Sequence, residues 1–365
     1  MTNQNQMGSE ILDCLGGFVD RHTQNTLAET AAIRDVSADG AGYKATLRMG
    51  YPCSLYKEQL AQELINHLLA AGLPQVEFDI DFEIATRSVQ GNLKPMTGIK
   101  NIIAVASGKG GVGKSTTAVN LALALAAEGA SVGLLDADIY GPSVPLMMGL
   151  EGRQPQSTDG KTLEPLEAFN VKCMSIGFLV DPEQPMVWRG PMVTSALNQL
   201  LSQTNWGELD YLVVDMPPGT GDIQLTLTQT VPVSGSVIVT TPQNIALSDA
   251  RKGLQMFRKV NVAVLGIVEN MSIHICSSCG HEDPVFGSDG GLSLSQQYDA
   301  PLLGQLPLDA SIRTRVDSGQ PSVVSEPESR VSGIYRQVAR RMAGELANLS
   351  KDYRRLFPNI VVEDS

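Results

Sequence analysis

The chain has 365 residues, of which 42% are hydrophobic and 18% are charged. This composition excludes a disordered chain, and the length allows two or three domains with buried cores. The formal net charge is −12, which argues against a nucleic acid as partner because phosphate binding needs a basic surface.

The N-terminal residues 1–10 are polar and show no basic start followed by an apolar run, so the sequence predicts no secretory signal. No stretch of eighteen apolar residues occurs, so no transmembrane helix is expected. The five cysteines do not form the pattern of a disulfide framework,. We therefore expect a cytoplasmic protein in a reducing compartment, without stable membrane insertion.

The first part of the chain predicts a small α/β domain. Residues 42–49 alternate like a strand, and residues 54–71 carry apolar side chains at helical spacing,. Residues 75–84 alternate apolar and acidic side chains, which is typical of a half-exposed strand on an antiparallel sheet. We place this domain at 1–92, followed by a turn-rich linker at 93–98.

From residue 99 onward the pattern changes to continuous apolar runs separated by segments of helix length. Such runs are typical of strands buried on both faces of a parallel sheet. The expected strands are at 102–107, 132–138, 211–217, 236–242, 262–270 and 301–307. The expected helices are at 115–128, 191–203 and 245–258. This alternation predicts a mostly parallel α/β sheet with helices on both faces over 99–350, followed by a tail at 351–365.

Residues 108–115, GKGGVGKS, match the phosphate-loop pattern GxxxxGK[ST]. The motif follows an expected strand and precedes an expected helix, which is the context that it requires. Its backbone N–H groups and the helix N-terminus are suited to phosphate oxygens. Lys114 is expected to reach the β- and γ-phosphates of ATP, and Ser115 is expected to hold Mg²⁺. The residues expected to bind ATP are Gly108, Lys109, Gly110, Gly111, Val112, Gly113, Lys114, Ser115 and Thr116.

Carboxylates stand at the ends of two expected strands. Asp136 and Asp138 end one strand, and Asp215 ends another. Because the carboxyl ends of parallel strands converge on the ligand crevice, these side chains are expected to lie near the phosphates. We expect Asp136 and Asp215 to join Ser115 at the Mg²⁺ site, and a second carboxylate to orient the attacking water. Each aspartate could instead be a helix cap or a turn residue.

Lys109 is a second lysine in the loop, which ordinary phosphate loops do not need. It is either a solvated charge or a lysine that reaches the phosphate of another subunit, as an arginine finger does. GKGGVGKST resembles the deviant phosphate-loop ATPases of the MinD/ParA/nitrogenase-iron-protein group. That resemblance implies a homodimer in which Lys109 contacts the facing nucleotide. It also implies that Asp138 positions the attacking water and that Asp215 lies on the Mg²⁺ side.

Cys276 and Cys279 form a CxxC motif shortly after the strand that ends at Asn270. The pair could be a redox dithiol, part of a zinc site with His274 and His281, or two structural thiols. Its late position in the domain disfavours the dithiol, and the cramped histidine spacing disfavours zinc. A fourth interpretation is half of a shared site. A twofold axis would bring four cysteines together, which is the number that an iron–sulfur cluster takes.

Five segments occur together and in order: GKGGVGKST, LLDADIYGPS, MVWRGPM, VVDMPPGTGD, and IVENMS followed by CSSC. This combination resembles the Mrp/ApbC family of iron–sulfur cluster carrier ATPases over about residues 99–345. The resemblance implies slow ATP hydrolysis and a homodimer that holds a labile 4Fe–4S cluster on Cys276 and Cys279. It further implies that a scaffold or donor protein supplies the cluster and that apo iron–sulfur client proteins receive it. It also places Asn270 at the adenine base.

Residues 1–98 resemble, more faintly, the small iron–sulfur assembly domain that is often fused ahead of this ATPase. Tyr51-Pro52-Cys53 resembles the Pro/Cys turn of that domain, but its acidic-proline segment is missing. We therefore interpret Cys53 as a buried structural residue, and Cys173 as a core residue of a strand.

The main alternative is a MinD/ParA-like positioning ATPase that binds membrane or DNA reversibly. Residues 334–349 carry apolar side chains every four positions, with arginines elsewhere around the helix. A helix of this kind can lie on a membrane, but a C-terminal core helix has the same pattern. A third possibility is an electron-transfer reductase like the nitrogenase iron protein, whose cluster cysteines are widely spaced. Since neither alternative accounts for the CxxC motif, the cluster carrier ranks first.

Overall fold

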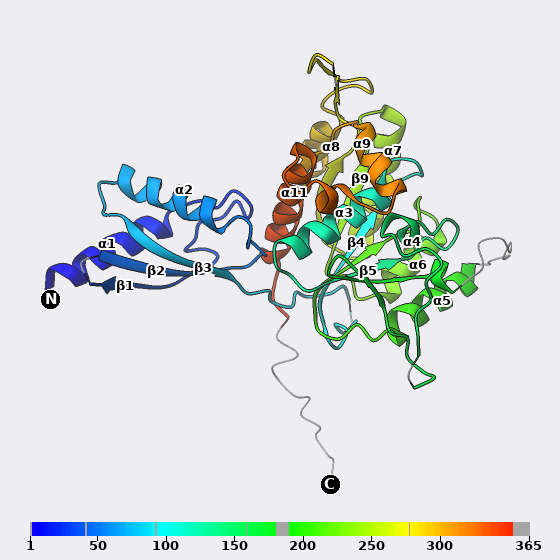
Figure 1. Ribbon diagram of the computed structural model, residues 1–365, viewed down its shortest axis with the longest axis horizontal. Coiled ribbons are helices and arrows are strands. Elements are labelled where there is room, and N and C mark those ends of the chain that lie inside the picture. Colours follow the sequence, from blue (N-terminus) through cyan, green and yellow to red (C-terminus); the bar gives the residue numbers. More distant parts are fainter. Residues whose placement is uncertain are drawn as a thin grey trace, which may run out of the picture.

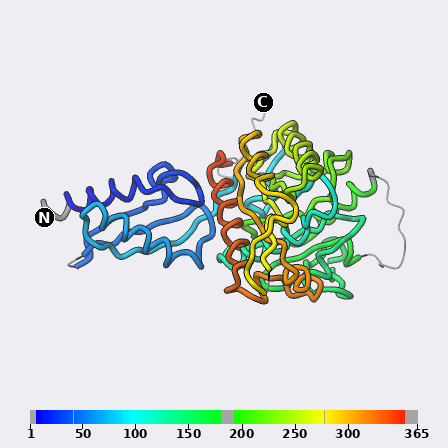
Figure 2. The backbone as a smooth tube through the Cα atoms, turned by 90° about the horizontal axis from the view of Figure 1, so that it is seen from above, coloured from blue at the N-terminus to red at the C-terminus, as the bar shows by residue number. Residues whose placement is uncertain are grey.

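The computed structural model describes residues 2–40, 42–91, 93–157, 159–179, 190–276 and 278–352. The described chain forms a small sheet, a large sheet and a two-stranded hairpin. Figures 1 and 2 show the small sheet and its helices beside the larger part of the molecule. The boundary at 93–98, between the last small-sheet strand and the first large-sheet strand, stays a prediction. We refer to these two parts as the small and large domains.

The small domain is a mixed three-stranded sheet with two helices on one face (Figure 1). Its elements are α1 (Thr2–Gly16), β1 (Ile33–Asp39), β2 (Gly42–Met49), α2 (Lys57–Ala70) and β3 (Val76–Phe82). β1 pairs antiparallel with β2, whereas β2 pairs parallel with β3. The prediction of antiparallel pairing for 75–84 is therefore wrong. α2 crosses from the end of β2 to the start of β3, and such a crossover brings the next strand back parallel.

The large sheet has the strand order β13-β10-β9-β4-β8-β5-β7-β6. Its strands are β4 (Ile99–Ala106), β5 (Val132–Asp136), β6 (Leu166–Ala168), β7 (Val171–Ser175), β8 (Leu209–Asp215), β9 (Gly235–Thr240), β10 (Val264–Glu269) and β13 (Leu302–Gln305). All neighbouring strands are parallel except the edge pair β6 and β7. The predicted mostly parallel sheet is confirmed. Strands β4, β5, β8 and β9 are buried nearly throughout, as their continuous apolar runs predict,.

Helices flank this sheet. They are α3 (Lys114–Ala127), α4 (Val144–Met147), α5 (Gly190–Gln203), α6 (Asp222–Thr230), α7 (Asn244–Lys259), α8 (Gly290–Tyr298), α9 (Ala310–Asp317), α10 (Ser322–Ser325) and α11 (Arg330–Ala347). Right-handed crossovers place α3 on one face and α6, α7 and α8 on the other, because the chain moves in opposite directions along the sheet,. The three predicted helices are confirmed.

The amphipathic C-terminal segment is a core helix. α11 packs along α3 and against β10 and β13, and it buries Val331, Tyr335, Val338, Met342 and Leu346. Its apolar face is therefore occupied within the chain. None of the described helices is long and apolar enough to cross a lipid bilayer.

Part of the predicted MVWRGPM segment, residues 186–189, lies outside the described residues, as does the tail beyond residue 352. Cys53 and Cys173 are buried, and Cys173 lies in β7 as predicted. Burial raises the pKa of the Cys53 thiol to about 12, which keeps it protonated at neutral pH.

The small domain packs closely on the C-terminal end of α11. Asn348 donates through Nδ2 to the Thr23 carbonyl (2.8 Å) and accepts through Oδ1 from Asn25 Nδ2 (2.8 Å). A Cβ built on Gly344 would lie 2.3 Å from the His22 carbonyl oxygen. Because that neighbour is backbone, this helix position has no room for a side chain.

We predict that Gly344→Ala lowers the free energy of unfolding by about 1–3 kcal/mol, because the methyl group forces the two domains apart. Gly333→Ala is the matched control, since it lies on the same helix and a Cβ added there would meet no atom within 4 Å. Alanine there should raise stability by up to about 1 kcal/mol. Urea denaturation of both variants is the measurement, and equal effects would contradict the close contact.

A buried histidine lies at the same junction. His22 is 3% exposed, and within the described chain its ring nitrogens have no hydrogen-bond partner. The rings of Tyr51 and Tyr56 meet it edge-on. Burial, reinforced by nearby arginines, lowers its pKa to about 3. The charged groups around it are Asp20, Arg21, Arg340 and Arg341.

Stability should therefore fall in acid. The unfolded chain protonates this imidazole below its ordinary pKa of 6.5, whereas the folded chain resists protonation until about pH 3. Between these values each pH unit should remove about 1.4 kcal/mol from the free energy of unfolding. His22→Phe keeps the ring contacts and should have a shallower slope between pH 6.5 and 5. Equal slopes in urea denaturation would contradict a neutral buried His22.

Candidate nucleotide and cluster site

The phosphate loop joins β4 to α3 and is held from two sides. Gly113, the N-cap of α3, has φ 82°, a left-handed conformation that favours glycine,. A Cβ there would lie 2.1 Å from Asn270 Nδ2. A Cβ on Gly108 would lie 2.1 Å from the carbonyl carbon of Asp249 in α7. The glycines therefore allow this loop to pack against α7 and the end of β10.

Asn270 supports the loop backbone. The residue is 8% exposed, and its Nδ2 donates to the Val112 carbonyl (2.9 Å). Its own N–H donates to the Thr240 carbonyl (2.7 Å), so it is fixed to the end of β9. The predicted contact of Asn270 with adenine stays a prediction.

Lys114 and Asp215 form a buried ion pair. Their Nζ and Oδ1 atoms are 2.5 Å apart, and the side chains are 6% and 0% exposed. Lys114 Nζ also lies 3.2 Å from Ser115 Oγ. The structure therefore brings together three of the predicted site residues, contributed by the start of α3 and the end of β8. A buried charge is costly without a partner, so each member of this pair depends on the other.

The residues around Asp215 fit a Mg²⁺ ion. Asp215 Oδ2 is buried and has no hydrogen-bond partner within the described chain. The Ser115 hydroxyl lies close by, because Lys114 contacts both residues. Carboxylate and hydroxyl oxygens are ligands that Mg²⁺ uses at phosphate sites. When bound, the ion would neutralise charge on the β- and γ-phosphates.

Asp136 has a different environment from Asp215, which it faces in the register of β5 and β8. Its carboxylate accepts four hydrogen bonds, from the N–H groups of Asp138 (3.1 Å), Ser143 (3.0 Å) and Val144 (3.1 Å) and from the Ser175 hydroxyl (3.1 Å). Burial, and then the charge of Asp215, raises its pKa to about 7. Asp136 thus anchors the segment after β5, and its role at Mg²⁺ stays a prediction.

Two further predicted residues border the site. Asp138 is half-buried, and burial raises the pKa of its carboxyl although Lys114 opposes the shift. Lys109 is half-buried and forms no ion pair with any described residue. The Lys109 carbonyl accepts a hydrogen bond from the Ser107 hydroxyl (2.9 Å), which fixes the backbone of Lys109. A role for Lys109 across a dimer stays a prediction.

The CxxC motif is at the tip of a short hairpin that projects from the large domain (Figure 1). Strands β11 (His274–Ile275) and β12 (Glu282–Asp283) pair antiparallel below it. Cys276 donates its N–H to the His281 carbonyl (2.9 Å) and accepts at its own carbonyl from the Gly280 N–H (2.8 Å). Cys276 is partly exposed and Cys279 is exposed, and both are free thiols.

The tip favours thiolate chemistry. Hydrogen bonds from the backbone N–H groups of Ser278 and Cys279 lower the pKa of Cys276. Thiolates are the form that binds metals and clusters. Among the described residues, no group of three or more histidine, cysteine or acidic side chains is arranged for a metal ion. The zinc site with His274 and His281, which their spacing disfavours, is therefore not assembled among the described residues.

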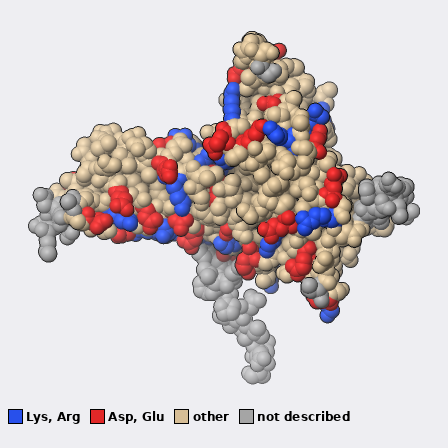
Figure 3. All heavy atoms as spheres, viewed as in Figure 1, with Lys and Arg blue, Asp and Glu red and all other residues tan. Residues whose placement is uncertain are grey.

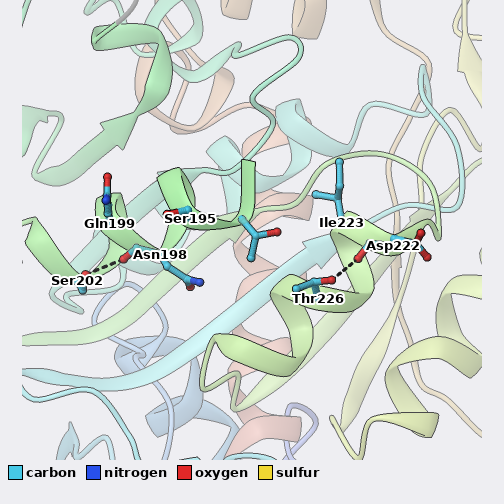
Figure 4. Close-up of a pocket in the computed structure, with 8 residues that line it drawn as sticks. Ser195, Asn198, Gln199, Ser202, Asp222, Ile223 and Thr226 are labelled. Atoms are coloured by element: carbon cyan, nitrogen blue, oxygen red, sulfur yellow. Dashed lines mark hydrogen bonds between the residues drawn. The ribbon is translucent and has the colours of Figure 1, made fainter. Parts of the chain in front are cut away.

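A cavity that the sequence did not indicate lies between α5 and α6 (Figure 4). Its volume is about 740 Å³, and it is lined by Thr194, Ser195, Asn198, Gln199, Ser202, Asp222, Ile223 and Thr226. Hydroxyl groups of Ser202 and Thr226 donate to carbonyls of their own helices (both 2.7 Å). None of these lining residues is basic, so the cavity is poorly suited to phosphate.

Comparisons with known proteins identify the family of the chain. A ParA family model described as "NUBPL iron-transfer P-loop NTPase" matches residues 98–343. The "Iron-sulfur cluster carrier protein" of Escherichia coli K12 is 57% identical over 290 residues, covering 80% of this chain and 78% of that protein. The mouse "Iron-sulfur cluster transfer protein NUBPL" is 56% identical over 255 residues, covering 69% and 80%. A nucleotide-binding protein from Archaeoglobus fulgidus, solved with ADP, has a TM-score of 0.56 and 39% identity, covering 64% and 90%.

We predict that Lys114 and Asp215 are strongly coupled in stability. Lys114→Met and Asp215→Leu should each cost about 3–5 kcal/mol, because each leaves one buried charge unpaired, and the double variant should cost far less than their sum. Urea denaturation without nucleotide measures the coupling.

The control is the exposed pair Arg313 and Asp317, with side chains 74% and 53% exposed. Replacing either of these should change stability by less than about 1 kcal/mol. Additive costs for Lys114 and Asp215 would show that the two groups are not paired in solution.

Proposed function

The chain belongs to the NUBPL iron-transfer family of P-loop NTPases, and from this premise we propose that it is an ATP-hydrolysing carrier of iron–sulfur clusters. Its cargo would be a labile 4Fe–4S cluster held between two copies of the chain. Hydrolysis would be slow, with ADP and phosphate as products. We place the protein in the cytoplasm, where donor or scaffold proteins supply the cluster and apo iron–sulfur proteins receive it.

The single observation that supports this function best is the accessible pair Cys276 and Cys279 at the tip of the hairpin. One chain offers two thiols there, whereas an iron–sulfur cluster takes four ligands. A twofold axis through the hairpin tips supplies the other two. Two ligands from each subunit leave much of the cluster open to solvent, and this exposure allows a thiol of a client protein to displace them.

The nucleotide site supplies the second part of the proposal. ATP would offer phosphate oxygens to Lys114, which is paired with Asp215. Asp215, whose Oδ2 has no hydrogen-bond partner within the described chain, and Ser115 would hold Mg²⁺, and the ion would neutralise charge on the phosphates. Asp138 would orient the attacking water. Lys109, which no carboxylate of its own chain neutralises within the described residues, would contact the nucleotide of the facing subunit.

The positioning ATPase is the weaker proposal. It requires a surface that binds membrane or DNA. The segment suited to that role is the face of α11, which is buried on α3, β10 and β13. On the face of the molecule in Figure 3, basic side chains are interspersed with acidic ones and do not gather into a broad basic patch. The net charge of −12 also disfavours DNA,.

Separate variants should remove the two activities independently. Cys276→Ala should lose the cluster after anaerobic reconstitution but keep ATP hydrolysis, because the hairpin tip lies outside the phosphate loop. Lys114→Ala should keep the cluster and lose hydrolysis by about a hundredfold or more. Iron and acid-labile sulfide analysis, visible absorption and phosphate release are the measurements.

Cys14→Ala is the control, since it removes a free thiol elsewhere in the chain. It should leave both activities intact. Retention of the cluster in the Cys276→Ala/Cys279→Ala double variant would refute the assigned ligands. Loss of both activities in each single variant would refute separate sites.

A further inference from the structure

The helix that carries the phosphate-loop lysine ends against the small domain. α3 begins at Lys114 and has Glu128 as its C-cap. With a rise of 1.5 Å per residue, its 14 residues span roughly 21 Å,. One continuous helix therefore joins the phosphate loop to the junction between the domains.

Glu128 is the contact at this end of the helix. Its Oε2 accepts a hydrogen bond from the Leu55 N–H (2.9 Å), and its carbonyl accepts one from the Ser54 N–H (3.1 Å). Its Oε1 lies 3.6 Å from Arg340 Nε, and the Arg340 guanidinium lies 4.6 Å from the centre of the Tyr56 ring. We call residues 51–56 the docking turn, because this segment binds both α3 and α11.

Within the large domain the Glu128 carboxylate has a charged partner in Arg340 of α11, 3.6 Å away, but its place at the end of α3 is unfavourable. A helix C-terminus carries partial negative charge and disfavours an acidic side chain. The Glu128 side chain is fully buried, and burial raises the pKa of its carboxyl although Arg340 opposes the shift. The backbone N–H of Leu55, in the small domain, supplies a hydrogen-bond donor that the end of α3 lacks. The carboxylate is thus suited to holding the small domain rather than to stabilising α3.

Close packing at both ends of α3 leaves little room for movement. A Cβ on Gly129, which has φ 95°, would lie 2.5 Å from Ser54 Oγ. At the other end, Gly113 packs against Asn270 and Gly108 packs against α7. Because such interiors are dense and poorly compressible, a shift of the docking turn moves the helix as a body.

We propose that Glu128 is a positioning residue through which the small domain sets the geometry of the phosphate loop and thereby its affinity for nucleotide. This inference rests on the nucleotide binding in the proposed function, but it does not depend on the cluster. Coupling between two sites is reciprocal. If the docking turn stabilises the phosphate loop, bound nucleotide must likewise stabilise the docking turn.

The first test uses the full-length wild type, with hydrogen exchange measured with and without ADP and Mg²⁺. The amides of residues 53–56 and 128–130 should exchange more slowly when ADP is bound. ADP binding without any change at these amides would overturn the inference and leave the proposed function standing. Absence of ADP binding would overturn the proposed function itself.

Variants provide the second test. Glu128→Ala should weaken ADP binding by about fivefold or more, and should raise the KM for ATP more than it lowers kcat. Glu128→Gln keeps an acceptor for the Leu55 N–H and should stay within about twofold of wild type.

Asp210→Asn is the matched control. Ser131, three residues after Glu128, donates its N–H to the Asp210 carboxylate (3.0 Å). Asp210 also forms an ion pair with Lys100 (2.8 Å), which lies in the large domain. This variant should leave ADP affinity unchanged. If Glu128→Ala speeds exchange in the docking turn but binds ADP like wild type, Glu128 has only a structural role and the proposal is wrong.

Discussion

The buried ion pair between Lys114 and Asp215 is the interaction on which the nucleotide site depends. The side chains of Lys114 and Asp215 are 6% and 0% exposed, and their Nζ and Oδ1 atoms are 2.5 Å apart. Each therefore compensates the cost of burying the other. The pair joins the start of α3 to the end of β8, across the centre of the sheet. A phosphate that attracts the lysine must therefore disturb the aspartate as well. Ligand binding and the arrangement of these two elements cannot be separated.

The segment after β10, which supports the phosphate loop, also leads into the cysteine hairpin. Asn270 holds the phosphate-loop backbone through Val112, and only a few residues later the chain enters β11 and reaches Cys276. Ser272 fixes the intervening segment through its N–H and hydroxyl, which both donate to the Leu306 carbonyl (2.9 Å each). The phosphate loop and the proposed cluster site are thus joined by a short piece of chain that is anchored at both ends. Coupling between the two sites through this piece of chain is a proposal.

Much of this arrangement follows from sequence, because local patterns encode it. The glycine-rich loop between a strand and a helix predicts the phosphate site, and the strand end predicts that Asp215 lies near it. The ion pair between Asp215 and Lys114 was not predicted. The sequence leaves open whether Asp136 caps a turn or binds Mg²⁺, and only the fold brings the Ser175 hydroxyl, 39 residues away, to its carboxylate. The sequence also does not predict the contact of Glu128 with the small domain, because its hydrogen-bond donor, the Leu55 N–H, lies in a distant part of the chain. The parallel pairing of β3 depends on the path of α2, which strand alternation does not report.

We propose that the cluster needs two chains, because each chain offers two thiols, Cys276 and Cys279, at the hairpin. Native mass spectrometry of the anaerobically reconstituted protein tests this directly, since it reports chain number and cluster content in the same ion. We expect the dimer to carry about four iron and four sulfide, whereas protein without the cluster should not be restricted to the dimer mass. A monomer that carries an intact cluster, or a dimer that carries zinc, would contradict it.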